Sequence, residues 1–294
     1  MKAPPVPLPH PSPLERVMTR VDALADGAPA AGDADDSVAT GFPSIDRILG
    51  GGVRAGDLVV IGGDVGSGKS ALALAVALRA AHERPERAVA FLSGEMAEER
   101  TAERALAIEG RARVDELRQG TLDDAARAGV GAAVLRLRDS GLALDRLPPG
   151  GVDALADELR RTLDLRLAVV DGLPSLAGGA RERDEELAAA AARLKTLALE
   201  LRVPLVVTAP LPALDRDRAD LRPRLDDFGA LGAVKQHADV VLALFREEMY
   251  TTQPGVDGAT ELLVLKNRNG PTGYADLYFY KQWMRFEDML DPDR

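Results

Sequence analysis

The sequence predicts a mixed α/β domain with a mainly parallel sheet, helices on both of its faces and an antiparallel edge near the C-terminus. From about Thr40, short apolar runs alternate with Ala- and Leu-rich stretches of ten or more residues at helical spacing. Such alternation is typical of parallel strands joined by crossover helices. A glycine-rich turn links the first apolar run to the first long helix. Residues 261–287, which hold most of the aromatic residues, are expected to form strands and turns.

The composition narrows the possible classes of function. The chain has 294 residues, is 46% hydrophobic and carries a net charge of −10. It can therefore fill a core, but it is not expected to bind nucleic acid or anionic membrane through net charge alone. The absence of cysteine excludes disulfides and thiol catalysis, and three histidines argue against a multi-histidine metal site. With no signal peptide and no apolar run of about 20 residues, we expect a soluble, cytoplasmic protein without membrane contact.

The first 39 residues are expected to form a disordered tail that carries one short helix. Residues 1–13 are proline-rich, and residues 27–39 form an acidic linker. Apolar residues at helical spacing predict an amphipathic helix over residues 14–25: Leu14, Val17, Met18, Val21 and Leu24. This helix either packs on its own domain or docks on a neighbouring subunit.

The main domain is expected to span residues 40–290. Six apolar runs predict strands in it: Leu58–Ile61, Ala88–Leu92, Leu167–Val170, Leu205–Thr208, Val240–Leu244 and Glu261–Leu265. Five longer stretches predict helices: Ser70–Ala81, Ala97–Ile108, 122–138, 152–163 and 183–202. His237 and Trp283 are expected to be packed side chains, although Trp283 could also line a nucleotide base.

The strongest local signal is a complete G-x-x-x-x-G-K-[ST] motif between an apolar run and a helix. It consists of Gly63, Asp64, Val65, Gly66, Ser67, Gly68, Lys69 and Ser70. The glycines let several backbone N–H groups face one anion, and the helix N-terminus adds partial positive charge. In such a loop Lys69 reaches the β- and γ-phosphates and Ser70 ligates Mg²⁺. The alternative is a glycine-rich turn without a ligand.

Two carboxylates are expected beside this loop. Asp171 ends the apolar run LAVVD, where it can hold the water shell of a metal ion, or alternatively cap a turn. Glu95 follows the run AVAFLSG, where it can act in catalysis or alternatively stabilise a helix N-terminus. Because parallel strands end at the same edge of a sheet, the three segments are expected to converge.

A pair of cations near the C-terminus lies far from this loop in sequence. Lys266 and Arg268 alternate in an extended segment, so their side chains leave on the same side. Two cations on a rigid turn suit the γ-phosphate of a neighbouring subunit's nucleotide, as an arginine finger does. The alternative is an exposed basic turn.

Together these segments resemble the C-terminal ATPase domain of the DnaB-type replicative DNA helicases. The similarity runs from about Thr40 to Glu287 and includes TGFPSIDRILGGGVRAGDLVVI, the phosphate loop, FLSGEM, LAVVDGLPSL, LKTLALELRVPL, HADVVLALFREEMY and KNRNGPTG. The resemblance implies a RecA-like P-loop NTPase fold and a homo-hexameric ring with nucleotide between subunits. It also implies that the linker helix docks on a neighbour.

The resemblance assigns roles to the candidate residues. It implies that Lys69 and Ser70 hold the phosphates and Mg²⁺ of bound ATP, and that Glu95 is the catalytic base. Asp171 becomes the acidic residue that holds the water shell of the metal ion. Lys266 and Arg268 become the pair that reaches the next subunit's γ-phosphate.

Three departures from the family pattern affect the expected function. Only about 39 residues precede the ATPase core, so primase or loader contacts through the family's N-terminal helical domain are not expected. Pro210 stands where the family has a glutamine that links the γ-phosphate to the DNA loops. Gly229, Ala230 and Leu231 replace a segment that contains an Arg-Glu pair. In addition, FLSGEM and IGGDVGSGKS are similar to the related RadA/KaiC ATPases.

Arginines in two loops are candidates for contact with single-stranded DNA in the pore of a ring. They follow the strands that end near Asp171 and Thr208: Arg181, Arg183, Arg216, Arg218, Arg222 and Arg224. Each has acidic neighbours, so the alternative is a solvated loop of mixed charge. No aromatic residue lies in these loops to stack on bases.

The expected function is an ATP- and Mg²⁺-dependent ring motor on single-stranded DNA, with helicase activity in replication. The alternatives are an ATP-switched assembly or regulatory protein without DNA translocation, and a RadA/KaiC-like ATPase.

Overall fold

The computed structural model describes residues 12–26, 36–177, 183–251 and 255–289. The chain divides into two compact units, Met1–Ser37 and Val38–Arg294. The first unit contains helix α1 (Pro13–Ala25), which begins after a reciprocal cap between Ser12 and Glu15. The predicted apolar face is exposed within it: Leu14, Val17, Met18 and Val21.

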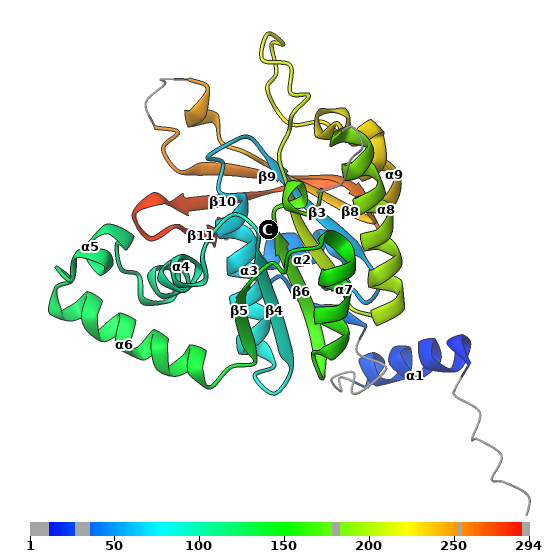
Figure 1. Cartoon of the computed structure of the whole chain (residues 1–294), viewed down its shortest axis with the longest axis horizontal. Helices are drawn as coiled ribbons and strands as arrows, with labels where there is room; N and C mark the ends of the chain where they lie inside the picture. The colour runs from blue at the N-terminus through cyan, green and yellow to red at the C-terminus, as the bar shows by residue number, and fades with distance from the viewer. Residues whose placement is uncertain (1–11, 27–35, 178–182, 252–254, 290–294) are drawn as a thin grey trace, which may run out of the picture. The chain divides into compact units, whose positions relative to one another are not determined.

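The second unit is built on a nine-stranded sheet in the order β11-β10-β9-β8-β3-β7-β6-β4-β5 (Figure 1). Strands β8, β3, β7, β6, β4 and β5 run parallel, whereas β9, β10 and β11 join antiparallel at one edge. The strands are β3 (Leu58–Gly63), β4 (Ala88–Ser93), β5 (Leu142–Arg146), β6 (Leu165–Asp171), β7 (Leu205–Ala209), β8 (Val240–Phe245), β9 (Ala259–Asn267), β10 (Gly273–Tyr280) and β11 (Arg285–Asp288). A further two-stranded sheet joins β1 (Ser37–Val38) and β2 (Val53–Arg54). The predicted fold class is thus confirmed.

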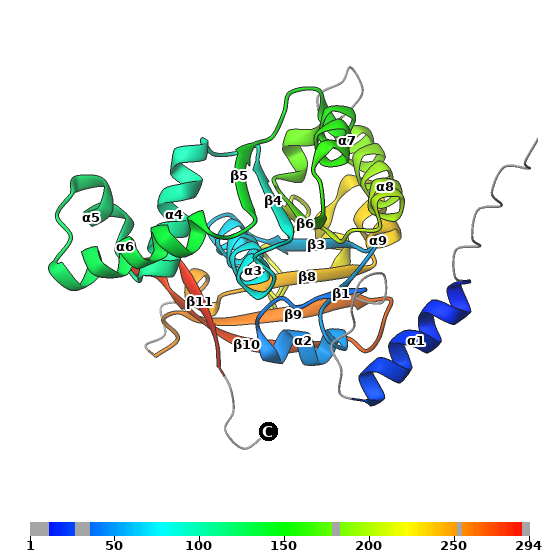
Figure 2. The ribbon, with the colours of Figure 1, turned by 90° about the horizontal axis from the view of Figure 1, so that it is seen from below.

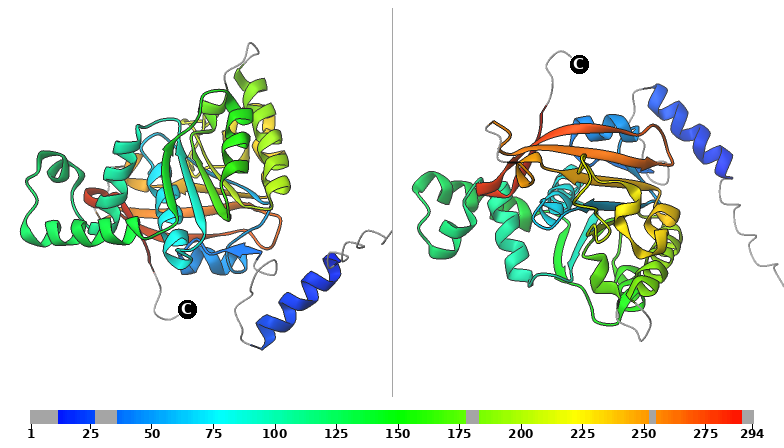
Figure 3. Two further views of the ribbon diagram at one scale, coloured as in Figure 1. Left: turned by 60° about the horizontal axis from the view of Figure 1, so that its bottom comes forward. Right: turned by 90° about the horizontal axis from the view of Figure 1, so that it is seen from above.

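Two helix layers cover the sheet (Figures 2 and 3). One layer holds α2 (Pro43–Leu49), α3 (Lys69–Glu83) and α4 (Glu98–Gly110), from which α5 (Val114–Gln119) and α6 (Asp124–Arg138) extend. The other holds α7 (Gly151–Arg161), α8 (Arg183–Leu201) and α9 (Ala233–His237). Short 3₁₀ segments complete the fold: Leu173–Leu176, Leu225–Phe228, Ala230–Gly232, Glu247–Met249 and Lys281–Trp283.

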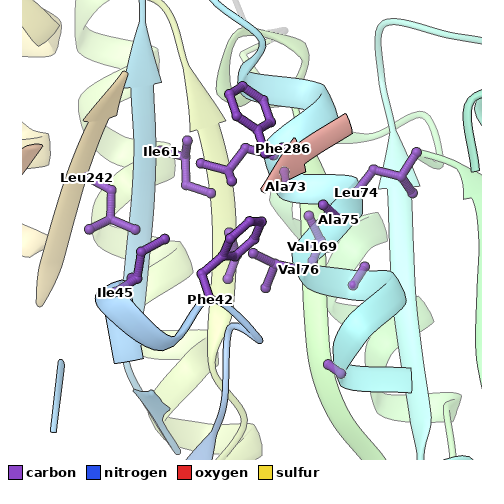
Figure 4. Packing of buried hydrophobic residues seen from close by; sticks show 14 of the residues in the cluster. Phe42, Ile45, Ile61, Ala73, Leu74, Ala75, Val76, Val169, Leu242 and Phe286 are labelled. Carbon is purple, nitrogen blue, oxygen red and sulfur yellow. The ribbon is translucent and has the colours of Figure 1, made fainter. Parts of the chain in front are cut away.

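The central strand β3 shows why its sequence is apolar throughout. Val59 and Ile61 point into the layer with α2 and α3, and Leu58 and Val60 point into the opposite layer. A strand covered on both faces has no solvent side, so apolar residues follow without alternation. Figure 4 shows Ile61 packed with Phe42, Ile45 and residues of α3 in the first of these cores.

Several short elements are absent from the sequence-based prediction. The edge strand β5 was not predicted, because residues 142–146 are mostly exposed and contain only a brief apolar run. Helices α2, α5 and α9 have seven, six and five residues, which is too short for a period of 3.6 residues to be recognised. The longer predicted elements are all present, with ends that differ by a few residues.

Candidate nucleotide site

The glycine-rich loop joins the end of β3 to the start of α3. Gly68 has a left-handed φ of 101°, which turns the chain into α3. Gly63 leaves room for Ser67, since a Cβ there would lie 2.4 Å from the Ser67 hydroxyl oxygen. The first N–H groups of α3 have no intrahelical acceptor, and the first such bond in the helix runs from Leu72 N to Gly68 O. The loop therefore presents free N–H donors at a helix N-terminus.

Lys69 lies within this loop with its ammonium group held by the backbone. Its Nζ donates to the Asp64 carbonyl oxygen at 2.9 Å. Burial lowers the pKa of Lys69, and the nearby carboxylates of Glu95, Asp171 and Asp64 oppose that shift. A cation with this placement can exchange a carbonyl oxygen for a phosphate oxygen with little movement of the side chain.

Asp171 ends β6 and Glu95 follows the neighbouring strand β4, so the two lie at the same edge of the sheet. Asp171 ends β6 opposite Ser93 of β4 and is fully buried. Its Oδ1 accepts a hydrogen bond from the Thr208 hydroxyl at 2.8 Å. The Ser93 hydroxyl accepts the backbone N–H of Glu95 at 3.3 Å and thereby fixes the turn that carries Glu95. Burial raises the pKa of the Glu95 carboxyl, with further repulsion from Asp171.

A cavity of about 430 Å³ lies over these groups. Its walls include the phosphate loop, Glu95, residues of β7 and the β10–β11 hairpin. The lining residues are Val65, Gly66, Gly68, Lys69, Ser70, Ala71, Glu95, Met96, Arg104, Thr208, Ala209, Pro210, Phe279, Lys281 and Met284. The predicted phosphate loop and Glu95 thus meet in one place, with Asp171 buried near Lys69.

The residues fit a nucleotide with a bound Mg²⁺ ion. The Ser67 hydroxyl is a buried polar atom of the described chain that has no hydrogen-bond partner, and it lies inside the loop with the free N–H donors. Hydroxyl and carboxylate oxygens, which Ser70 and Asp171 supply, are the ligands that Mg²⁺ prefers. Within the described residues, no cluster of three or more His, Cys, Asp or Glu suggests a different metal site.

Arg104 also lines the cavity, although it is not among the residues predicted from the sequence. It lies on α4 next to the buried Thr101, Ala105 and Ile108. Burial lowers its pKa, whereas the charges of Asp171 and Glu95 raise it. Its charge in turn opposes the rise in the pKa of Glu95. One face of this helix is formed by positions 101, 104, 105 and 108. A cation on that otherwise uncharged face was the feature of the sequence that could have indicated a role for Arg104.

Lys266 and Arg268 lie at the other end of the sheet from the phosphate loop. The Arg268 guanidinium donates to Asp239 Oδ1 at 3.0 Å and to the Gln236 carbonyl at 2.7 Å. Lys266 Nζ donates to the carbonyl oxygens of Lys235 and Ala238. Asp239 in turn bonds to the backbone of Leu58, the first residue of β3. The phosphate loop begins at Gly63, the last residue of that strand. A six-residue strand separates the two ends by about 17 Å, so this pair is remote from its own phosphate loop.

The candidate DNA-binding arginines differ in their surroundings. Arg218 forms two bonds to the Asp227 carboxylate, at 2.8 and 2.7 Å, and Arg222 forms two to Glu261. Arg216 donates to Asp64 of the phosphate loop at 2.9 Å. Arg183 and Arg224 are exposed, and Arg181 lies outside the described residues. Contact of these arginines with DNA stays a prediction.

The residues that depart from the family pattern differ in their positions. Pro210 forms part of the cavity wall directly after Thr208 and Ala209. Ala230 and Leu231 adopt left-handed φ values of 51° and 52°, which are uncommon for residues other than glycine. The Leu231 side chain is 66% exposed. Neither Trp283 nor His237 lines the cavity; both side chains are half-buried, as expected of packed residues.

The chain is similar in sequence to curated replicative helicases. It is 31% identical over 258 residues to the replicative DNA helicase DnaC of Bacillus subtilis, covering 86% of this chain and 56% of that protein. It is 33% identical over 259 residues to the replicative DNA helicase DnaB of Leifsonia xyli, with the same coverage. The chain therefore spans about half the length of the curated relatives it matches.

The fold is shared with solved structures. A solved ATPase domain superposes with a TM-score of 0.83 at 22% identity, covering 96% of this chain and 100% of that one. A DnaB-like replicative helicase, described with its interactions with primase, gives a TM-score of 0.81 at 21% identity, covering 96% of this chain and 68% of that one. Among the helices of the described residues, none has the length and apolar character that a membrane span requires. The family described as DnaB-like helicase C terminal domain matches residues 37–288, and the chain belongs to that family.

Proposed function

We propose that this chain is an ATP- and Mg²⁺-dependent motor that acts on single-stranded DNA as a hexameric ring, with helicase activity in replication. The observation that carries the proposal is the separation of two half-sites. The phosphate loop and Glu95 line one cavity, whereas Lys266 and Arg268 lie at the far end of β3. A complete site then needs the Lys266 and Arg268 of another copy, as in a head-to-tail ring.

In this proposal each residue of the cavity has one task. The loop from Gly63 to Ser70 binds the phosphates through its N–H groups and Lys69. Bound Mg²⁺, which Ser70 and Asp171 would hold, supplies neutralisation of phosphate charge. Glu95 accepts a proton from the attacking water.

Steady-state ATP hydrolysis with and without single-stranded DNA tests the proposal, with Lys69→Ala as the blank. We expect hydrolysis that single-stranded DNA stimulates and that Lys69→Ala abolishes, because removing the ammonium removes the charge that faces the phosphates. Hydrolysis that DNA leaves unchanged would contradict a DNA motor.

One observation favours a second function, an ATP-switched assembly or regulatory protein. The cavity wall has Pro210, which offers neither a side-chain amide nor a backbone N–H to a phosphate. Oligomerisation that depends on nucleotide, without any DNA effect on hydrolysis, would support this function. Strand exchange or autophosphorylation would instead support a RadA/KaiC-like ATPase.

The pH dependence of hydrolysis is expected to depend on Arg104. A general base must be ionised, so the rate falls as the pH drops through the pKa of Glu95. Because the charge of Arg104 lowers that pKa, Arg104→Ala should raise it. The acidic limb of the kcat profile should then move to higher pH.

Two variants serve as controls for this shift. Arg104→Lys keeps the charge and should keep the limb near its original position. Arg100→Ala removes an exposed arginine of the same helix and should leave the limb unmoved. An unchanged limb in Arg104→Ala would argue against Glu95 as the base.

We also propose that residues 1–39 act as a tail whose helix α1 docks on a neighbouring subunit, with residues 40–290 as the ATPase domain. The support is the exposed apolar face of α1, where Leu14 is 78% and Met18 is 55% exposed within the unit. Leu14→Glu with Met18→Glu should therefore lower the assembly size in light scattering. The control Arg16→Glu places the same charge on the helix outside that face, and an equal loss with it would contradict specific docking.

A further inference from the structure

Asp64 connects the phosphate-binding lysine to a distant loop. Its backbone carbonyl accepts the Lys69 ammonium at 2.9 Å. Its carboxylate accepts the Arg216 guanidinium at 2.9 Å through Oδ1 and the Tyr250 hydroxyl at 3.2 Å through Oδ2. Asp64 thus contacts both the ammonium of Lys69, which would bind phosphate, and the segment that follows β7.

That segment, residues 211–224, is a loop anchored by its own side chains. It forms the yellow projection at the top of Figure 1. Leu211 and Leu214 are buried on one side of Arg216. On the other side Arg218 is 12% exposed and bonds both oxygens of Asp227. Arg216 therefore lies between two anchored positions of the loop.

Arg216 and Asp64 differ in solvent exposure, and this difference suits an ion pair that forms and breaks reversibly. The Arg216 side chain is 63% exposed and the Asp64 side chain is 10% exposed. An ion pair open to solvent contributes little to stability, so it can form and break at low cost. Asp64 keeps hydrogen bonds from Tyr250 and from the backbone of Val65 when Arg216 leaves. The pair can therefore open without unfolding the phosphate loop.

We propose that the Arg216–Asp64 ion pair couples the phosphate loop to residues 211–224, an inference that rests on the proposed nucleotide site. When Lys69 exchanges the Asp64 carbonyl for a phosphate oxygen, that carbonyl loses the ammonium but keeps the Ser67 N–H at 3.1 Å. The change of charge beside Asp64 alters its ion pair with Arg216, and the loop responds. Arg216 is thus a positioning residue of the phosphate loop. It supplies a route from nucleotide to the loop that does not pass through Pro210.

Hydrogen–deuterium exchange of residues 211–224, with Mg²⁺ and either ADP or a non-hydrolysable ATP analogue, tests this coupling. In the unchanged chain we expect nucleotide to alter the exchange of these amides by about fivefold, a usual size for coupling between sites. Arg216→Ala should remove that response while nucleotide still binds. Arg216→Lys, which keeps a cation, should restore part of it.

Three further variants separate coupling from a structural defect. Asp217→Asn changes an exposed neighbour on the same loop and should keep the full response. Asp64→Asn should weaken the response, and the double variant with Arg216→Ala should be no worse than Arg216→Ala alone, because both remove one link. A response that survives Arg216→Ala, or that Asp217→Asn abolishes equally, overturns the proposal.

Nucleotide binding, measured beforehand by calorimetry, separates this proposal from the proposed function. Binding of nucleotide without any change of exchange in the loop overturns the coupling alone. Failure to bind nucleotide overturns both. If the loop responds but single-stranded DNA never stimulates hydrolysis, the coupling stands and the DNA motor is wrong.

Discussion

Replacing Glu95 by glutamine is expected to abolish ATP turnover while nucleotide still binds. The amide has nearly the same shape but cannot accept a proton from water. General base catalysis contributes about 10²–10⁴-fold in rate, so kcat should fall within that range. The phosphate contacts come from the loop between β3 and α3, which Glu95→Gln leaves in place. Nucleotide affinity should therefore change little.

Single-turnover hydrolysis and calorimetric titration with ADP measure the two halves of this expectation. The matched control is Glu98→Gln, which neutralises an exposed carboxylate in the first turn of α4. Its rate should equal that of the unchanged chain. A Glu95→Gln enzyme that hydrolyses ATP at a normal rate would show that another group takes the proton.

Thermal unfolding shows whether the lower activity of Glu95→Gln comes from a loss of stability. The carboxylate of Glu95 has a raised pKa, through burial first and repulsion from Asp171 second. A folded pKa above the unfolded value means that ionisation opposes folding once the pH exceeds the unfolded pKa. Glutamine removes that opposition, so Glu95→Gln should be at least as stable as the unchanged chain at pH 7. Lower activity then cannot be a result of unfolding.

The candidate site shows which features a sequence can predict. The phosphate loop was fully predictable, because its geometry depends on one local run of glycines between a strand and a helix. Glu95 and Asp171 were predictable from a more general rule, since parallel strands end at one edge, and Ser93 indeed pairs with Asp171. Both inferences needed only local sequence and the direction of the strands.

Contacts between distant segments were not predictable in the same way. Nothing in the run around Arg216 indicates Asp64 as its partner, 152 positions earlier. The bonds from Arg222 to Glu261 likewise depend on how a loop folds back on β9. These pairings are set by tertiary packing and not by periodicity. For this reason the arginines were all grouped as one candidate surface although their surroundings differ.

Replacing Arg268 by alanine is expected to abolish hydrolysis in an assembly made of that variant alone. Arg268 lies at the far end of β3 from its own phosphate loop, so its proposed target is the neighbour's nucleotide. A cation in that role contributes about 10³–10⁵-fold to the rate of phosphoryl transfer. The rate of Arg268→Ala should therefore fall close to that of the Lys69→Ala blank.

Loss of Arg268 also removes intramolecular bonds, so stability must be measured beside activity. Asp239 would lose its contact with Arg268 but keep Lys195 at 2.7 Å and the backbone of Leu58. The buried carboxylate thus stays paired, and only a modest decrease in melting temperature is expected. Lys235→Ala, which removes an exposed lysine of α9 beside the same site, is the control for damage to that region.

Mixing two inactive variants gives the sharpest test of action between subunits. A site that joins the phosphate loop of an Arg268→Ala subunit to the Arg268 of a Lys69→Ala subunit is complete. In a random one-to-one mixture about a quarter of head-to-tail interfaces have this composition, so activity should rise well above the sum of the two separate variants. An arginine that acted within its own subunit would give no such recovery, because every subunit in the mixture would carry one defect. Recovered hydrolysis would therefore show that the two ends of β3 serve different nucleotides, which requires contact between subunits.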